Sequence, residues 1–228
     1  MDAFAGYLAS LVGSWEALAT PHPDASVVRG AGFVAARFPS HPVLCNAVLL
    51  DPAALPALAG LYTGIPGYAV WSADGATAAV LAAAGMRRDE TTVPMRCDLR
   101  DLPPGADPAD GSPGVVADAD PGVVAAITGT DETLVRGVPG LRAYASAGHE
   151  SCLVLIPVGS DVNVSFVATL PRARRRGLAR SVLRRALHDA RDGGFATASL
   201  QATPMAERLY AAEGFAAVGA WQEWLPRS

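Results

Sequence analysis

Two stretches in the second half of the chain decide its fold: VNVSFVATLPRARRRGLA at residues 162–179 and LQATPMAERLYAAEGF at residues 200–215. The first is an apolar run that ends before Pro171 and continues into an arginine-rich loop and Gly177. A strand that leads through such a loop into a helix leaves the N–H groups of the first helical turn unpaired, and these groups attract phosphate. The stretch therefore predicts an anion site built mainly from backbone, where Gly177 allows a diphosphate to approach closely.

The segment after Gly177 has the pattern of an amphipathic helix. Its apolar residues recur at spacings of three and four, while arginines occupy the opposite face. The apolar set is Leu178, Val182, Leu183, Ala186, Leu187 and Ala190. We expect this stripe to pack on a sheet and the arginine face to stay in water.

The second stretch predicts a short helix over residues 204–213. Thr203 suits the N-cap, Pro204 suits the first helical position, and Gly214 follows the last apolar residues as a C′ glycine does.

Together these stretches resemble the GNAT family of N-acetyltransferases. The acetyl-CoA signature of that family is Gln or Arg, two residues, Gly, one residue, and Gly or Ala, and it reads here as RRRGLA from Arg174 to Ala179. Pro171 stands three residues before the signature, as the family's strand-to-loop corner does. The downstream residues Leu209, Tyr210, Gly214 and Phe215 match the family's LY…GF segment.

The resemblance implies acetyl-CoA as the co-substrate and assigns a role to each matching residue. Its diphosphate would bind Arg174, Arg175, Arg176, Gly177, Leu178, Ala179 and Arg180. The backbone of Val167, Ala168 and Thr169 would pair with the pantetheine amides, and Tyr210 would protonate the departing thiolate as a general acid. Two residues depart from the pattern: Thr203 stands where most members carry an Asn that contacts pantetheine, and Arg175 replaces a common Gly.

The sequence leaves the general base open. Glu150, His149, Asp161 and Glu132 are all candidates, and a chain of waters is an alternative. Glu150 is the first to test, because His149 and Glu150 precede a predicted strand that lies beside the central one.

The composition indicates which classes of ligand and partner to expect. Half of the residues are hydrophobic and the net charge is −4, which is typical of a globular protein. Eight arginines lie between residues 172 and 191 without an interleaved aromatic residue, so we expect a small polyanion as ligand and no nucleic acid. Cys45, Cys97 and Cys152 are far apart in sequence, which favours reduced thiols in the cytoplasm, and no spacing suggests a metal site. We expect no membrane segment, and a homodimer is left open.

The chain is expected to be an α/β protein with a mixed sheet, in two parts. The Pro- and Gly-rich segment at 102–114 separates residues 1–105 from residues 106–228, and the second part carries the GNAT fold. The first part is either a GNAT-like repeat without a cofactor site or an unrelated module that forms a wall of the acceptor pocket. Leu81, Gly85 and Met86 faintly echo Leu209, Gly214 and Phe215, which favours the repeat.

Periodicity predicts the remaining elements. We expect helices at 3–19, 52–60, 75–84 and 120–128, and strands at 27–37, 43–50, 68–72, 91–99, 141–147, 151–158, 162–169, 196–201 and 215–224.

The expected function is direct transfer of an acetyl group from acetyl-CoA to a primary amine of a small molecule. The alternative from another class is a non-catalytic protein that keeps the acyl-CoA site as a sensor or assembly module.

Overall fold

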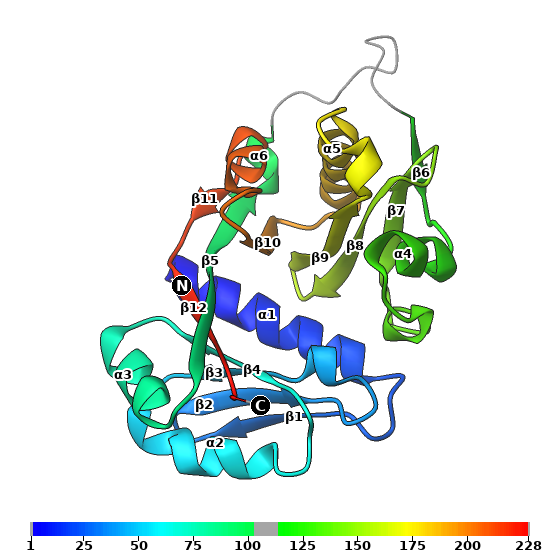
Figure 1. The fold of residues 1–228 in the computed structure, drawn as a ribbon. Coiled ribbons are helices and arrows are strands. Elements are labelled where there is room, and N and C mark those ends of the chain that lie inside the picture. The colour runs from blue at the N-terminus through cyan, green and yellow to red at the C-terminus, as the bar shows by residue number, and fades with distance from the viewer. Residues whose placement is uncertain (1, 103–113, 228) are drawn as a thin grey trace.

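The computed structural model describes residues 2–102 and 114–227 (Figure 1). Its strands form one mixed sheet of 12 strands, in the order β1-β2-β3-β4-β12-β5-β10-β9-β8-β7-β6, with β11 paired to β5. The first half contains α1 (Ala3–Ala19), β1 (Ser26–Gly30), β2 (Phe33–Arg37), β3 (Asn46–Leu49), α2 (Leu55–Leu61), β4 (Ala69–Ser72), α3 (Gly75–Ala83) and β5 (Arg87–Asp98). The second half contains β6 (Val115–Ala117), α4 (Pro121–Thr128), β7 (Arg142–Ser146), β8 (Ser151–Val158), β9 (Asp161–Thr169), α5 (Leu178–Asp192), β10 (Thr197–Ala202), α6 (Glu207–Ala212), β11 (Ala216–Ala217) and β12 (Trp221–Leu225).

The two halves repeat one order of elements. In each, a helix precedes three antiparallel strands, β1-β2-β3 in the first half and β7-β8-β9 in the second. A helix then leads to a fourth strand that pairs parallel to the third, as β4 does with β3 and β10 with β9. A further helix, α3 or α6, leads toward the last strand of each half. The chain is thus a tandem arrangement of two similar units.

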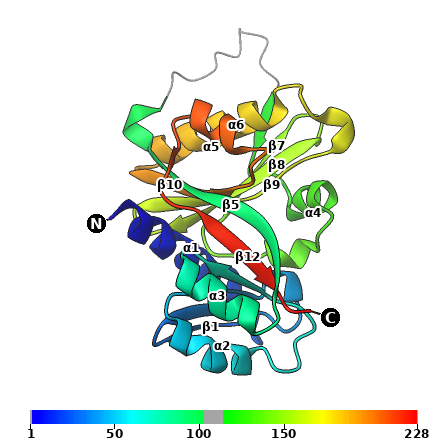
Figure 2. The same ribbon diagram turned by 60° about the vertical axis from the view of Figure 1, so that its left-hand side comes forward.

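The last strands of the two halves are exchanged. Strand β5 of the first half pairs with β10 of the second, and β12 of the second half pairs with β4 of the first. The exchanged strands also pair with each other, and Figure 2 shows them side by side where the halves meet. Each half is therefore completed by a strand from the other. The division at residues 102–114 stays a prediction, since residues 103–113 lie outside the described part of the chain.

Helix α1 lies between the halves (Figure 1) and packs closely against the second. A Cβ at Gly6 would come within 2.3 Å of Arg96 Nη1 on β5, and one at Gly13 within 2.3 Å of Val158 Cγ1 on β8. These glycines explain how the helix approaches the sheet so closely. Helix α5 and Tyr210 of α6 pack on one face of the second half's sheet, and α1 and α4 pack on the other.

Several element boundaries differ from the predictions. The strand expected at 27–37 is a hairpin, because Gly32 at φ +84° turns the chain between β1 and β2. The final strand expected at 215–224 is two strands, β11 and β12. The helix expected at 204–213 begins only at Glu207, because residues 204–206 form a turn in which the Thr203 carbonyl accepts from the N–H groups of Ala206 and Glu207. Thr203 is therefore not an N-cap, and the prediction of that role was wrong.

Within the described residues, no helix has the length and apolar character needed to cross a bilayer. The same residues contain no cluster of three His, Cys, Asp or Glu side chains that could hold a metal ion.

Candidate active site

The loop before α5 presents unpaired backbone N–H groups. In the described parts of the chain, the N–H groups of residues 175–180 donate to no protein acceptor, and Ser181 is the first to bond back, to the Gly177 carbonyl at 3.0 Å. Gly177 caps the helix at φ +76°, with nothing within 4 Å of the place where a Cβ would stand. Arg175 also takes a left-handed conformation, at φ +62°, which explains why glycine suits this position. The loop is an open, positively polarised helix N-terminus.

Helix α5 buries the predicted apolar stripe. The sequence analysis is confirmed for each member of the set, which is Leu178, Val182, Leu183, Ala186, Leu187 and Ala190. These residues pack on β7 to β10 and on Met95 and Cys97 of β5. The packing fixes the direction in which the first turn of the helix points.

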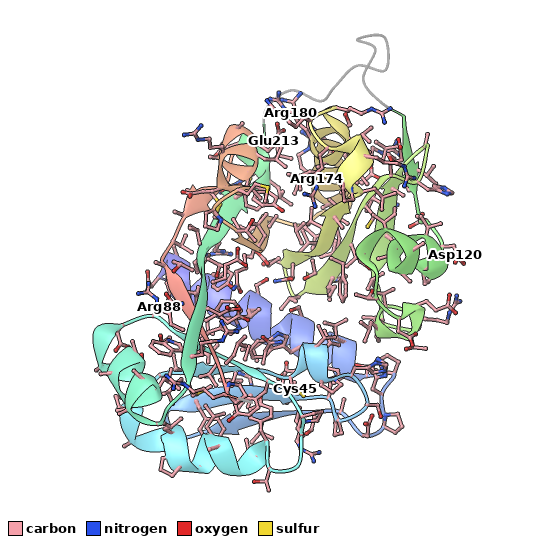
Figure 3. All side chains as sticks on the ribbon, viewed as in Figure 1. Cys45, Arg88, Asp120, Arg174, Arg180 and Glu213 are labelled. Carbon is pink, nitrogen blue, oxygen red and sulfur yellow. The ribbon has the colours of Figure 1, made fainter. Side chains whose placement is uncertain are left out.

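Two glutamates brace the arginines around this loop. The Glu150 carboxylate accepts from Arg176 Nη1 at 3.2 Å and lies 3.7 Å from Arg172 Nε. Glu213, which follows α6 and is only 1% exposed, accepts from the Nε–H groups of Arg180 and Arg184. Figure 3 shows Arg180 and Glu213 close together between α5 and α6. Glu213 could not be predicted as a site residue, because its position beside Gly214 gives no sign of a contact with a helix some thirty residues earlier.

Strand β9 diverges from β10 beside the loop. The two strands pair only over residues 161–163 and 197–199, although β9 continues to Thr169 and β10 to Ala202. On its other side, β9 carries a bulge opposite β8, with Phe166 at φ +52°. The edge of β9 from Val164 to Thr169 therefore faces β10 without strand pairing, which leaves backbone groups for an extended ligand. Val167, Ala168 and Thr169, predicted to contact pantetheine, lie on this edge.

A cavity of about 310 Å³ occupies the gap between the two strands. It is lined by residues from α1, β9, β10, the turn before α6 and α6 itself. They are Tyr7, Leu11, Asn163, Val164, Ser165, Phe166, Val167, Gln201, Thr203, Ala206 and Tyr210. The cavity thus brings together three predicted site residues, Val167, Thr203 and Tyr210, and takes two lining residues from the first half of the chain.

Tyr210 is 5% exposed, and its ring packs edge-on against Phe215 at a centroid distance of 5.9 Å. Burial raises the pKa of its hydroxyl to about 12, so the phenol is protonated at neutral pH. The described residues provide no hydrogen-bond partner for this hydroxyl, which leaves it available to a ligand in the cavity.

Hydrogen bonds hold several of the polar side chains that line the cavity. The Tyr7 hydroxyl donates to Gln201 Oε1 at 2.9 Å, and Gln201 Nε2 donates to Thr92 Oγ1 at 2.7 Å. Beside it, Ser165 Oγ donates to Asn163 Oδ1 at 2.6 Å, and Asn163 Nδ2 donates to Ser10 Oγ at 3.2 Å. None of these residues was predicted from the sequence. Tyr7 and Gln201 are 194 positions apart along the chain, and Asn163 and Ser10 are 153 positions apart.

None of the four candidate bases lines this cavity. Glu150 braces the arginine loop, and Glu132 pairs with Arg136 at 3.1 Å. Asp161 begins β9 and accepts from Ser199 Oγ at 3.0 Å and Arg96 Nη2 at 3.3 Å, while His149 sits in a turn at φ +50°. The assignment of Glu150 as a base stays a prediction, and its contacts favour a structural role.

Comparison with known proteins identifies the fold. The family model described as "Acetyltransferase (GNAT) family" matches residues 102–215, which is half of the chain. The chain belongs to the GNAT acetyltransferase family. Membership makes the protein an acyltransferase and agrees with the α/β fold predicted from the signature.

Solved GNAT structures match nearly the whole chain. A GCN5-related N-acetyltransferase from Kribbella flavida has a TM-score of 0.71 at 21% identity, over 97% of this chain and 96% of that one. A GNAT-family acetyltransferase from Novosphingobium aromaticivorans has a TM-score of 0.64 at 21% identity, with the same coverage. A tandem GNAT protein from the clavulanic acid biosynthesis pathway has a TM-score of 0.54 at 15% identity, over 89% of this chain and 83% of that one. A search of curated proteins gave no significant match.

Within residues 2–102, the first half differs from the second at the positions of the arginine loop and of Tyr210. Where the second half has its arginine loop, the first has Asp51, whose carboxylate accepts from the Ala53 N–H at 2.9 Å and caps the 3-10 turn Pro52–Ala54 that leads into α2. Leu81 occupies the position that Tyr210 has in the second half. The Leu81 carbonyl accepts from the Met86 N–H and the Tyr210 carbonyl from the Phe215 N–H, both at 3.1 Å, and in each case a glycine of positive φ precedes the donor. This pairing corrects the expected match of Leu81 with Leu209.

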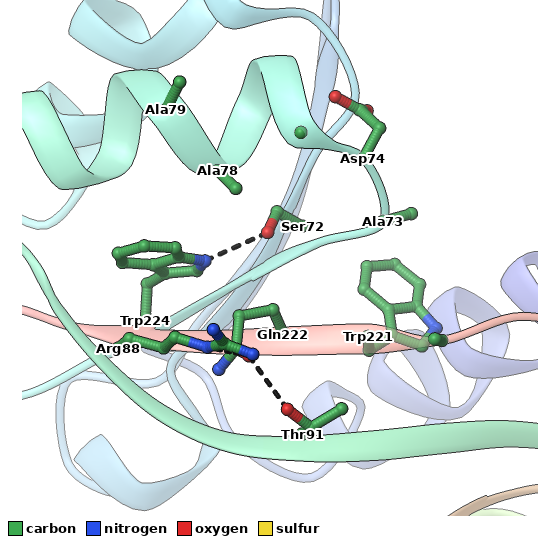
Figure 4. A pocket seen from close by; sticks show the side chains of 12 residues that line it. Ser72, Ala73, Asp74, Ala78, Ala79, Arg88, Thr91, Trp221, Gln222 and Trp224 are labelled. Atoms are coloured by element: carbon green, nitrogen blue, oxygen red, sulfur yellow. Dashed lines mark hydrogen bonds between the residues drawn. The ribbon is translucent and has the colours of Figure 1, made fainter.

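A larger hollow of about 520 Å³ lies in the first half, between α3 and β12 (Figure 4). Several of its polar side chains bond to one another: Trp224 Nε1 donates to Ser72 Oγ at 3.0 Å, and Thr91 Oγ1 donates to Gln222 Oε1 at 2.9 Å. The buried Trp221 Nε1, which also lines the hollow, has no acceptor among the described residues. At the N-terminus of α3 beside it, the Asp74 carboxylate accepts from the N–H groups of Ala76 and Thr77, and no tyrosine is among its described lining residues. We therefore place the candidate active site in the second half of the GNAT chain.

Proposed function

We propose that this GNAT protein transfers an acetyl group from acetyl-CoA to a primary amine of a small molecule. Two observations carry the proposal: within the described residues, the N–H groups of residues 175–180 have no protein acceptor, and the Tyr210 hydroxyl in the cavity has no protein partner. The N–H groups and the α5 dipole suit the diphosphate, and the edge of β9 from residue 164 to 169 suits the pantetheine arm. Thr203, in place of the usual Asn, supplies a hydroxyl near that arm.

The chemistry is direct transfer in a ternary complex. The amine nitrogen attacks the thioester carbonyl carbon, the C–N bond forms, and the C–S bond breaks. Tyr210, neutral and a hydrogen-bond donor, gives its proton to the departing sulfur.

A small molecule is a better partner than nucleic acid. Six of the eight arginines between residues 172 and 191 already pair with carboxylates, which removes most of the cluster from phosphate binding. These arginines are Arg172, Arg176, Arg180, Arg184, Arg185 and Arg191. The three buried free cysteines suit the reducing cytoplasm, where we propose that the protein acts.

Calorimetry with acetyl-CoA tests the donor. Saturable binding by the pure protein is the expected result, and no binding at millimolar acetyl-CoA would overturn the proposal.

The variant Tyr210→Phe tests catalysis against the sensor alternative. An enzyme loses turnover in this variant while keeping its affinity for acetyl-CoA, because the phenyl ring preserves the packing on Phe215. Tyr68→Phe is the control, since Tyr68 stacks on Tyr62 in the first half and should leave both turnover and binding unchanged. A wild-type protein that binds acetyl-CoA but acetylates no amine would instead be a sensor.

A further inference from the structure

Glu213 is a buried charged residue beside the arginine loop. Among the described residues, only Asp161 and Glu213 are buried charged side chains, and Glu213 is the more buried of the two, at 1% exposure. One oxygen of its carboxylate accepts from Arg180 Nε and the other from Arg184 Nε. These arginines lie one turn apart on α5 and remain partly in water, at 48% and 24% exposure. We call the three side chains the Glu213 clamp.

The Glu213 clamp joins two elements that face different parts of the proposed cofactor site. Arg180 lies in the first turn of α5, and its own N–H belongs to the unpaired row at residues 175–180. Glu213 follows α6 directly, three residues after Tyr210. Thr203, Ala206 and Tyr210, from α6 and the turn before it, line the gap between β9 and β10. The clamp therefore ties the loop that suits the diphosphate to one wall of the gap that suits the pantetheine arm.

Helix α6 depends on such contacts more than α5 does. Helix α5 has 15 residues and buries six apolar side chains, which hold it on the sheet. Helix α6 has six residues, and Tyr210 is the one that it buries. A helix this short is not stable by itself, so its position follows from its contacts with the rest of the protein. Loss of the clamp should consequently move α6 and leave α5 in place.

The first half of the chain shows that the fold does not require the buried carboxylate. Ala84 is the C-cap residue of α3, as Glu213 is of α6, and a glycine of positive φ follows each. Ala84 is exposed. Burying a carboxylate is costly even when it is paired. Its presence in the half that has the arginine loop, and its replacement by alanine in the other, indicate a role in the site.

Building on the proposed function, we infer that Glu213 is a positioning residue, which holds the α6 wall of the gap at a fixed place relative to the diphosphate loop. Glu213 does not line the gap itself. It acts through Thr203 and Tyr210, which the clamp keeps in place before the cofactor arrives. A wall that is already ordered lets the pantetheine arm bind without the entropic cost of ordering α6.

Two ligands distinguish the two parts of the site. The nucleotide 3′-phospho-ADP carries the diphosphate of coenzyme A without the pantetheine arm, whereas acetyl-CoA carries both. Calorimetry with the full-length protein gives the Kd of each ligand and the ratio of the two values. In the wild type, acetyl-CoA should bind more tightly, because only its arm reaches the edge of β9 and the α6 wall.

Glu213→Gln removes the charge at nearly constant shape. The carboxamide has one acceptor oxygen, and its amino group cannot accept from the second arginine. We expect acetyl-CoA to bind about tenfold more weakly, the loss that corresponds to one charge-assisted hydrogen bond. The Kd of 3′-phospho-ADP should not rise, because α5 stays in place and the released arginines add positive charge near the diphosphate.

Arg184→Met is a second variant, which removes one bond of the clamp and keeps an apolar stem. It should weaken acetyl-CoA binding in the same way and by a smaller factor. Asp189→Asn is the matched control: Asp189 also accepts from two partners, Arg185 Nε at 2.8 Å and the Tyr144 hydroxyl at 3.2 Å, but lies in the last turns of α5. Both Kd values should stay unchanged in this control. Urea unfolding shows which variants fold.

Equal weakening of both ligands by Glu213→Gln would overturn the inference, because the clamp would then support the stability of the whole site. Unchanged acetyl-CoA affinity in this variant would overturn it as well. If Glu213→Gln does not fold, the same two outcomes in Arg184→Met decide. A wild-type protein that binds neither ligand fails the proposed function itself, whereas one that binds acetyl-CoA and keeps its affinity ratio in the variants fails only the role of Glu213.

Discussion

The Tyr7 hydroxyl donates to Gln201 Oε1 at 2.9 Å, which joins α1, the first helix of the chain, to strand β10 of the second half. Both side chains line the cavity between β9 and β10, so the candidate active site of the second half takes part of its lining from the first. Residues of the first half therefore contribute directly to the cavity that carries the proposed function.

The variant Tyr7→Phe should lower kcat/KM for the acceptor about fivefold and leave acetyl-CoA affinity unchanged. The loss corresponds to about 1 kcal/mol, the typical net value of one buried hydrogen bond. Steady-state kinetics with the acceptor varied at saturating acetyl-CoA measures it. Tyr62→Phe is the matched control, because the Tyr62 hydroxyl also bonds within the protein, to the carbonyls of Ala36 and Asn46, but lies in the first half. Equal kinetic effects in the two variants would show that Tyr7 acts through stability alone.

Gly177→Ala should weaken acetyl-CoA binding about tenfold and lower the free energy of unfolding by about 1 kcal/mol, because a Cβ is strained at φ +76°. Relief of the strain would rotate the first turn of α5 and misalign its N–H groups. Gly64→Ala is a close control, since Gly64 has φ +81° and the same open surroundings in the first half. It should lose stability by a similar amount and keep its affinity. Calorimetry and urea unfolding measure the two quantities, and normal affinity in Gly177→Ala would contradict this account of the loop.

Acetyl-CoA should bind with a stoichiometry of one per chain. In the first half the Asp51 carboxylate caps the 3-10 turn that leads into α2, where it accepts from the Ala53 N–H and would repel a diphosphate. Calorimetric titration of the whole chain measures the stoichiometry. A value of two would mean that the first half kept a cofactor site.

The sequence predicted the local features of the site well. The arginine loop, the α5 stripe and the turn at Gly214 each depend on residues within about fifteen positions, where periodicity and glycine geometry carry the information. Two predicted elements had wrong bounds: the strand at 27–37, which turns at Gly32, and the helix at 204–213, which follows a turn after Thr203. In both places a local turn replaces part of the regular element.

The contribution of Tyr7 and Gln201 to the cavity could not be predicted from the sequence, for a different reason. Tyr7 and Gln201 meet only because α1 packs across the sheet of the other half, and the exchange of β5 and β12 joins the two halves. Neither arrangement follows from spacing along the chain. The equivalence of Leu81 and Tyr210 lies one position from the predicted match with Leu209. It can be recognised only from the hydrogen bonds that end α3 and α6.

The stability of the protein should fall between pH 10 and 12, partly through Tyr210. Burial raises the pKa of this phenol from 10 to about 12, so between these values the folded state holds a proton that the unfolded state has released. The unfolded state then binds fewer protons, and the free energy of unfolding decreases as pH rises. The contribution is complete below pH 10 and lost as pH passes about 12. Urea unfolding at intervals from pH 9 to 12 measures the slope.

Comparison with Tyr210→Phe isolates this contribution from those of Tyr7, Tyr62 and Tyr144, whose pKa values burial also raises. The slope of the variant should be shallower by up to about 1.4 kcal/mol per pH unit, the value for one proton. Parallel curves would mean that Tyr210 is solvated enough to titrate as a free phenol, and its role as a protonated donor in a dry cavity would then lose its physical basis.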